Sequence, residues 1–157
     1  MPMSATNKNP PSASLGMMAT GFWVSRAIHV AAKIGIADLL AQGPQCVEFL
    51  AERTKSNSNA LFRLLRALSA VGLFTSRNED VFELTDLGHG LRSDAEGSTR
   101  NYVLMLGRSE SWRAWEQLEH SIRTGGPAFE LAYDLPLFDY LAANPSIGEI
   151  FDEGMRS

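Results

Sequence analysis

The amino-acid sequence predicts a mainly α-helical, winged-helix-like fold with one small β-hairpin. Apolar residues recur at helical spacing through most of the 157 residues, and three short helical segments precede a hairpin pattern at residues 73–84. Strands do not alternate with helices, so the sequence predicts no parallel sheet that would hold a dinucleotide or a similar cofactor. A Rossmann-like catalytic domain is therefore expected to be absent from these residues.

The chain is expected to contain three parts. Residues 1–14 hold three prolines and no apolar periodicity, so they are expected to form a disordered tail. Residues 15–98 are expected to form the winged-helix-like domain, and residues 99–157 a helical extension. The last helix runs to the end without a capping residue, and Asp152 and Glu153 lie near the negative end of its dipole. This ending suggests that the natural chain continues past Ser157.

The first helix is expected over residues 15–34 and is apolar around most of its circumference. An ordinary surface helix buries one apolar stripe of about 100°. Here only Arg26, His29 and Lys33 form a narrow polar stripe, on which His29 is expected to face solvent. Such a helix needs cover from its own domain and from a second copy of the chain. The residues expected in this dimer interface are Trp23, Val24, Ala27, Ile28, Val30 and Ala31.

Further elements follow in order. Short helices are expected over residues 36–41 and 46–54, and a longer one follows Asn57 or Ser58, either of which is a suitable N-cap. Gly72 is expected to end the longer helix, and the hairpin strands are expected over residues 73–76 and 81–84. The apolar face of the longer helix, at i, i+3, i+4, i+7 and i+10, consists of Leu61, Leu64, Leu65, Leu68 and Val71.

The remaining residues are expected to be helical as well. Helices are expected over residues 85–91, 99–107, 109–124 and 134–143, and a last one begins at Asn144-Pro145. One side of the helix at 109–124 carries Trp112, Trp115, Leu118 and Ile122. The two tryptophans are interpreted either as core residues or as walls of a pocket for a flat aromatic ligand.

Composition and motifs exclude several kinds of site. The single cysteine, Cys46, rules out an internal disulfide and a cysteine-clustered zinc site, and no metal site is expected. No apolar run approaches the ~20 residues that span a bilayer, and no secretory signal is visible, so a soluble, cytoplasmic protein without membrane contact is expected. No nucleotide-binding loop follows a strand and no nucleophile motif occurs. We therefore assign no catalytic and no cofactor-binding residue.

The winged-helix order raises the alternative of a DNA-binding transcriptional regulator. Residues 53–77 carry five basic residues and no acid, and Arg63 and Arg66 lie off the apolar face of the would-be recognition helix. Carboxylates in and beside the hairpin would repel the phosphates whose neutralisation supplies most of the affinity, so nucleic-acid binding is not expected. These carboxylates belong to Glu79, Asp80, Glu83 and Asp86.

Seven segments stand in one order between about Leu15 and Met155. They are Ala31–Leu40, Leu61–Phe74, Leu84–Gly88, Leu91–Asp94, Arg123–Phe129, Phe138–Leu141 followed by Asn144-Pro145, and Phe151 with Met155 in an F-x-x-x-M pattern. In this order they resemble the N-terminal domain of small-molecule O-methyltransferases that use S-adenosylmethionine, of the hydroxyindole, caffeate and bacterial polyketide type.

The resemblance implies a homodimerisation domain that exchanges N-terminal helices and covers the pocket of a small, aromatic, hydroxylated substrate. S-adenosylmethionine and the catalytic residues belong, in that family, to a C-terminal Rossmann-like domain. This chain is therefore expected to be inactive alone; an independent dimer that binds aromatic ligands without chemistry remains a further alternative. The resemblance supplies as pocket residues Met105, Trp112, Trp115 and Met155, with Phe22 and Trp23 contributed by the partner.

Overall fold

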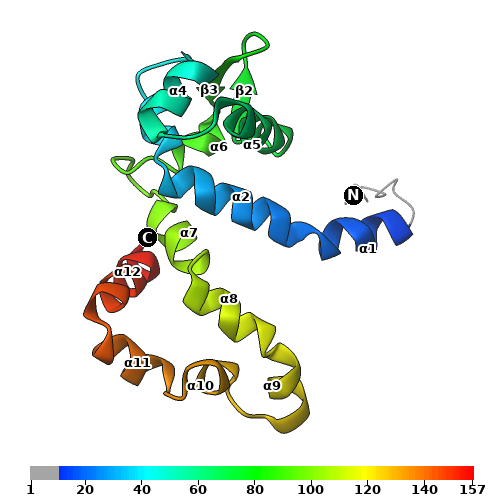
Figure 1. Ribbon diagram of the computed structural model, residues 1–157, viewed down its shortest axis with the longest axis vertical. Coiled ribbons are helices and arrows are strands. Elements are labelled where there is room, and N and C mark those ends of the chain that lie inside the picture. The colour runs from blue at the N-terminus through cyan, green and yellow to red at the C-terminus, as the bar shows by residue number, and fades with distance from the viewer. Residues whose placement is uncertain (1–10) are drawn as a thin grey trace, which may run out of the picture.

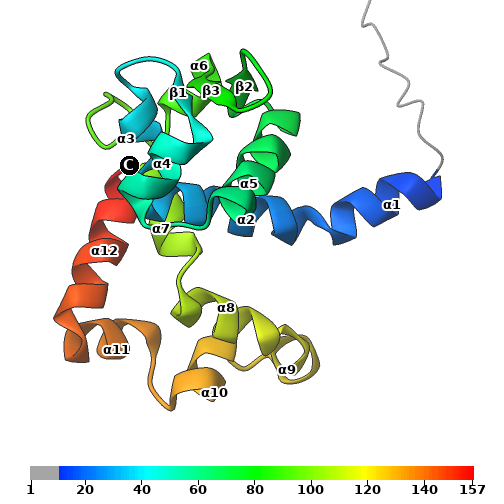
Figure 2. The same ribbon diagram turned by 45° about the horizontal axis from the view of Figure 1, so that its top comes forward.

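The computed structural model describes residues 11–157 and consists mainly of helices around one small antiparallel sheet (Figures 1 and 2). The central elements are α3 (Ile36–Leu40), β1 (Gln45–Cys46), α4 (Val47–Thr54), α5 (Ser58–Ala70), β2 (Phe74–Ser76) and β3 (Val81–Leu84). The strands have the order β1-β3-β2. The mainly α-helical fold with a small sheet is thus confirmed. The strand β1 was not predicted: Cys46 pairs with Val81 in the sheet, so the expected helix begins one residue later.

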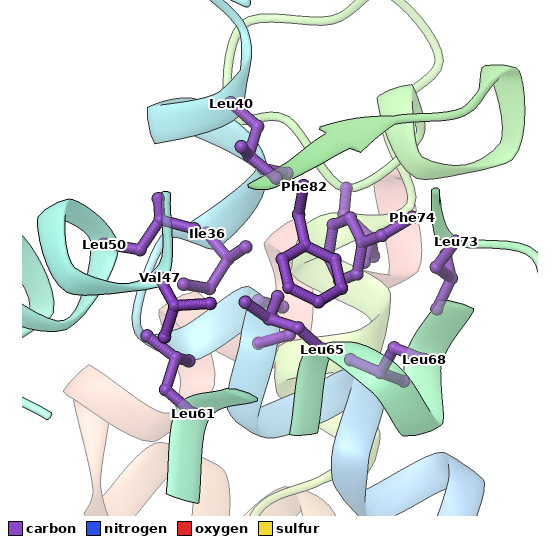
Figure 3. Close-up of a cluster of buried hydrophobic side chains, with 14 of the residues drawn as sticks. Ile36, Leu40, Val47, Leu50, Leu61, Leu65, Leu68, Leu73, Phe74 and Phe82 are labelled. Carbon is purple, nitrogen blue, oxygen red and sulfur yellow. The ribbon is translucent and has the colours of Figure 1, made fainter. Parts of the chain in front are cut away.

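The core lies between α5 and the sheet (Figure 3). Phe74 and Phe82 point from the strands toward Leu65, and all three side chains are fully buried. Full burial of a large apolar side chain contributes about 1.5–3 kcal/mol, so the predicted apolar face of α5 is a main source of stability. Other buried members of this cluster are Ile36, Leu40, Val47, Leu50, Leu61, Leu68 and Leu73.

Side-chain caps fix the ends of the central helices. Asn57, rather than Ser58, is the N-cap of α5, because its Oδ1 accepts a hydrogen bond of 3.0 Å from the Ala60 amide. Thr85 caps α6 (Asp86–His89) through a 3.1 Å bond from the Gly88 amide, and its hydroxyl lies 3.1 Å from the Leu73 carbonyl oxygen. The second cap therefore ties α6 to the residues that precede β2.

The N-terminal helix differs from its prediction. The structure contains α1 (Pro11–Ala19) and α2 (Gly21–Lys33) instead of one helix, and α1 includes residues 11–14 of the expected tail. Proline is favoured in a first helical turn, and the Thr20 hydroxyl donates back to the Gly16 carbonyl at the break. Residues 1–10 of that tail lie outside the described residues. Figures 1 and 2 show α1 and the start of α2 projecting from the rest of the chain.

The C-terminal half forms a loop of helices that returns to α7. Its elements are α7 (Arg100–Leu106), α8 (Ser109–Glu116), α9 (Leu118–Thr124), α10 (Ala128–Tyr133), α11 (Leu137–Ala143) and α12 (Pro145–Arg156). The expected single helix at 109–124 is broken at Gln117, where i→i+3 hydrogen bonds from Gln117 to Ala114 and from His120 to Gln117 tighten the turn. Helix α10 was not predicted, because the preceding Gly125-Gly126-Pro127 was interpreted only as a stop.

Replacing Gly88 by Ala is expected to destabilise the fold by about 1–3 kcal/mol through overpacking. A Cβ at this position would lie 2.1 Å from the Leu73 carbonyl oxygen, which Thr85 holds in place. Urea denaturation followed by circular dichroism measures the change. Gly21→Ala is the matched control, because a Cβ there meets no atom within 4 Å; equal stability of the two variants would contradict the predicted clash.

Candidate functional site

The contact between α2 and α7 buries a histidine. His29 is only 8% exposed and its Nδ1 lies 3.3 Å from the Val103 carbonyl oxygen, so the prediction that it faces solvent is wrong. Of the predicted polar stripe, Arg26 and Lys33 are exposed, and only His29 is covered, by α7, a segment about seventy residues later in the chain. Gly107 makes the close approach possible, because a Cβ at Gly107 would lie 1.9 Å from Nδ1 of His29.

An aromatic and cationic cluster joins α2 to α8. The Arg26 guanidinium donates to the Gly107 carbonyl oxygen, and its central carbon lies 5.1 Å from the centre of the Trp112 ring. The Phe22 ring meets the same tryptophan edge-on, with centroids 6.3 Å apart. Such cation–π and edge-to-face contacts are each worth about 0.5–1.5 kcal/mol. Trp112 is therefore held against α2 by these two contacts.

A polar cleft of about 450 Å³ lies beside His29. Burial lowers the pKa of His29, and the nearby Arg26, Lys33 and Arg108 act in the same direction, while the hydrogen bond to Val103 opposes them. Burial alone would raise the pKa of Glu110, but the hydrogen bonds from Arg108, the Glu110 amide and Ser109, together with the Arg108 charge, lower it. The cleft thus combines a neutral imidazole with a half-buried ion pair.

A smaller, apolar cavity of about 160 Å³ lies next to this cleft, and Arg108 and Glu110 line both of them. It is bounded by α7, α11 and α12, with Phe129 from α10, and Arg108, Glu110 and Ser111 add polar groups to its wall. An apolar lining with a few polar groups is typical of small-molecule sites, and the volume restricts an occupant to a small ligand. The apolar lining consists of Met105, Leu106, Phe129, Leu137, Tyr140, Leu141, Ile147 and Phe151.

The predicted pocket residues are not all brought together. Met105 lines the apolar cavity, where Gly154 of α12 packs against it. Trp112 lies under Phe22, whereas Trp115 and Met155 are 66% and 62% exposed and line no cavity described above. Phe22 and Trp23 are also exposed in the single chain. Sequence reasoning missed Phe129 and Tyr140, although aromatic residues spaced as Phe129, Tyr133 and Tyr140 could have indicated an aromatic cluster.

The predicted dimer residues divide into two groups. Trp23, Val24 and Val30 are exposed in the single chain and are free to meet a second copy. Ala27 and Ile28 are partly buried against the core of their own chain. Ala31 is only 1% exposed inside that core, so its assignment to the interface does not agree with this fold, because α7 and the core cover that side of α2.

The described residues do not fit S-adenosylmethionine. Their sheet is antiparallel, and no glycine-rich loop connects a parallel strand to a helix to present backbone amides to a nucleotide. Within residues 11–157, no three His, Cys, Asp or Glu side chains are arranged to hold a metal ion. No helix in this range is long and apolar enough to cross a membrane.

Residues 17–93 match the family model of the O-methyltransferase dimerisation domain. These residues belong to this family. Outside the matched range, the similarity continues: the phenazine O-methyltransferase PhzM of Lysobacter antibioticus is 40% identical over 144 residues, which are 92% of this chain and 42% of that protein. The chain spans less than half the length of this relative, and the matched dimerisation domain is only part of it.

Solved structures agree with this assignment. The crystal structure of LaPhzM has a TM-score of 0.89 at 39% identity and covers 94% of this chain and 44% of that one. A second similar structure is that of the O-methyltransferase NcsB1 from neocarzinostatin biosynthesis, in complex with S-adenosylmethionine and 2-hydroxy-5-methyl naphthoic acid. It has a TM-score of 0.70 at 35% identity, over 83% of this chain and 41% of that one. The helices that follow the dimerisation domain therefore also have counterparts in methyltransferases.

Replacing His29 by Gln is expected to flatten the pH dependence of stability on the acid side of neutrality. His29 is neutral in the folded chain because its pKa is lowered, whereas the unfolded chain binds the proton at the ordinary value of 6.5. The stabilising contribution is thus complete above this value, and it is lost as the pH falls from there through the lowered pKa of the folded chain. Thermal unfolding between about pH 7.5 and about pH 5 measures the slope.

The control for this experiment is His89→Gln, at an exposed histidine on α6. This variant is expected to keep the wild-type slope, whereas His29→Gln should lose part of it. If the wild type and both variants lose the same free energy of unfolding as the pH is lowered, the protonation of His29 does not cause the loss of stability in acid.

Proposed function

We propose that this chain is the dimer-forming and substrate-covering part of an S-adenosylmethionine-dependent O-methyltransferase, inactive by itself, that acts on small, aromatic, hydroxylated molecules. The observation that carries the proposal is the apolar surface of α1 and α2, which lies largely within the matched residues 17–93. Soluble monomers expose apolar patches of only a few hundred Å². The exposed apolar residues of these helices are Leu15, Met17, Met18, Phe22, Trp23, Val24 and Val30.

A homodimer is the arrangement that this surface supports best. A twofold interface uses the same patch on both chains, so each apolar side chain of α1 and α2 contributes twice to the buried area. The nine residues of α1 include no charged side chain, so their burial requires no charge to be desolvated. The exchange of N-terminal helices between the two chains is part of this proposal.

Sedimentation equilibrium at micromolar concentration is expected to give twice the chain mass of 17.2 kDa. Trp23→Glu is expected to weaken the dimer, because it would bury a carboxylate in an apolar interface. Trp23 is 63% exposed in the single chain, so the substitution should leave the fold of each chain intact. Leu131→Glu, at an exposed position on α10, is the control; a monomeric wild type would contradict the proposed dimer.

The apolar cavity beside α7 supports a role in covering an aromatic substrate. Its lining combines the predicted Met105 with the aromatic side chains of Phe129, Tyr140 and Phe151. Flat rings and a methionine suit a flat ligand, and the ion pair of Arg108 with Glu110 supplies polar partners for its substituents. The similar proteins named above act on or bind a phenazine or a naphthoic acid, by their descriptions.

A simple aromatic alcohol tests this cavity directly. We expect 1-naphthol to bind the chain saturably with a Kd on the order of 0.1–1 mM, as fits so small a ligand. Leu106→Trp should abolish binding, because Leu106 lines the cavity and an indole would fill it. The control variant Leu131→Trp carries the same indole ring at an exposed leucine that does not line this cavity, and it should bind 1-naphthol as the wild type does. Calorimetry that shows no saturable heat with the wild type would overturn the assignment of this cavity.

DNA binding is the second candidate function, and one observation favours it. Arg63 and Arg66 are exposed on α5, which occupies the place of the recognition helix in a winged-helix domain. The hairpin opposes this function: Glu79 and Asp80 are exposed in its loop, and Arg77 is paired with Glu83 at 2.6 Å. The paired arginine neutralises one carboxylate only, so the loop keeps its negative charge toward any phosphate.

A further inference from the structure

The apolar cavity beside α7 and the polar cleft beside His29 meet at one ion pair. Arg108 and Glu110 line both spaces, and among the described residues that line the apolar cavity Arg108 is the basic one. The cavity has a volume of about 160 Å³ and the cleft one of about 450 Å³. A ligand whose ring fills the cavity can therefore extend a polar substituent past this pair into the cleft.

The guanidinium of Arg108 keeps unused donors at this position. A guanidinium has five N–H groups in a planar fork, and the pair with Glu110 uses Nε and Nη2, at 3.0 and 3.1 Å. Within residues 11–157, Nη1 donates to no protein atom. The edge formed by Nη1 and the second hydrogen of Nη2 is therefore available. This is an edge with which arginine binds a carboxylate through two parallel hydrogen bonds.

Glu110 offers less to a ligand than Arg108 does. Each of its two carboxylate oxygens accepts a hydrogen bond from Arg108, and the Ser109 hydroxyl lies 3.4 Å from Oε2. The side chain of Glu110 is 15% exposed, compared with 29% for that of Arg108. The carboxylate thus holds the guanidinium in place, and the free donors of the pair favour an anionic ligand over a cationic one.

The polar cleft has an excess of one positive charge. Burial lowers the pKa of His29, so the imidazole is neutral at neutral pH and adds no charge. Lys33 forms no ion pair with any of the described residues. A ligand with a single negative charge would therefore balance the cleft. The charged residues that line it are the cations Arg26, Lys33 and Arg108 and the carboxylates Glu110 and Glu153.

We propose that Arg108 binds the carboxylate of an aromatic hydroxy acid whose ring lies in the apolar cavity. The proposal rests on the substrate-covering role proposed above, and it narrows the substrate class to aromatic hydroxy acids. Arg108 is then the residue that selects for the acid, and Glu110 is a positioning residue that acts on the ligand through Arg108. Because the Arg108 side chain is only 29% exposed, salt screens its interaction with a ligand less than it screens a surface pair.

Two ligands that differ by one carboxylate test the role of Arg108. The compounds 1-naphthol and 1-hydroxy-2-naphthoate have the same rings and the same hydroxyl group. In calorimetry at neutral pH, we expect the wild type to bind the acid at least about tenfold more tightly, which corresponds to about 1.4 kcal/mol. The cation (1-naphthyl)methylammonium should bind no more tightly than 1-naphthol. Tighter binding of the cation would show that Glu110 selects the ligand, which would overturn the proposal.

Replacing Arg108 by Gln is expected to reduce the preference for the acid to about twofold or less, because glutamine forms no charge-assisted pair. The double variant Arg108→Gln with Glu110→Gln should lose the preference as well, and it leaves no buried carboxylate without a partner. Arg123→Gln is the matched control and should keep the wild-type preference. Arg123 is also paired with a glutamate, Glu119 on α9, but it lines neither the cavity nor the cleft.

Failure of the Arg108 assignment differs from failure of the proposed cavity. A wild type that binds neither 1-naphthol nor the acid would contradict the cavity and the role of Arg108 together. A wild type that binds both compounds with equal affinity would overturn the role of Arg108 alone. A preference for the acid that persists in both Arg108 variants would assign the carboxylate to another cation of the cleft, which also overturns the proposal.

Discussion

The close packing of α2 against the end of α7 joins the N-terminal helices to the C-terminal half of the chain. Gly107 has no side chain, and the imidazole of His29 occupies the space that a Cβ would need. A buried polar group costs about 1–3 kcal/mol when it lacks a partner, and here the Val103 carbonyl oxygen lies within reach of Nδ1. Arg26 adds a second bond to the Gly107 carbonyl oxygen. Helix α2 and the start of the C-terminal half are thus held as one unit.

This unit explains why the single chain exposes so much apolar surface. The core between α5 and the sheet buries its own large side chains and needs no partner. Exposed apolar residues of α1 and of the first turns of α2, such as Leu15, Met18 and Trp23, take no part in that core. Two classes of apolar residue therefore exist in the chain. One class stabilises the fold, and the other is explained by association, as expected of a dimerisation domain.

Local patterns in the sequence were sufficient for the central elements. The leucine spacing of α5, the turn residues of the hairpin and the Thr85 cap all act between near neighbours, so periodicity and capping rules locate them. The strand β1 has only two residues and exists because β3 pairs with it, which no local pattern indicates. His29 was misplaced for the same reason, since the segment that covers it is distant in sequence.

The candidate pocket was predicted less completely than the fold. Met105 was identified through the family resemblance, and it does line the apolar cavity. Met155 is four residues after Phe151 on α12, yet only Phe151 lines the cavity while Met155 is exposed. Helical spacing places both residues on one side of α12, but their burial depends on the neighbours that each one meets. Phe129 was missed because α10 itself was not predicted, whereas Tyr140 was missed although its helix was predicted, because the contact of α11 with α12 is not a local pattern.

Helix α7 connects the two proposed roles physically. Val103 and Leu104 pack against the core of the dimerisation domain, whereas the next two residues, Met105 and Leu106, line the apolar cavity. Gly154 allows α12 to approach within contact of Met105, since a Cβ there would lie 2.8 Å from Met105 Cβ. The helices α2, α7 and α12 therefore form one close-packed stack with glycine at both contacts. A shift of α2 in the dimer would move α7, and through α7 the wall of the cavity, because a close-packed interior transmits displacement and does not absorb it.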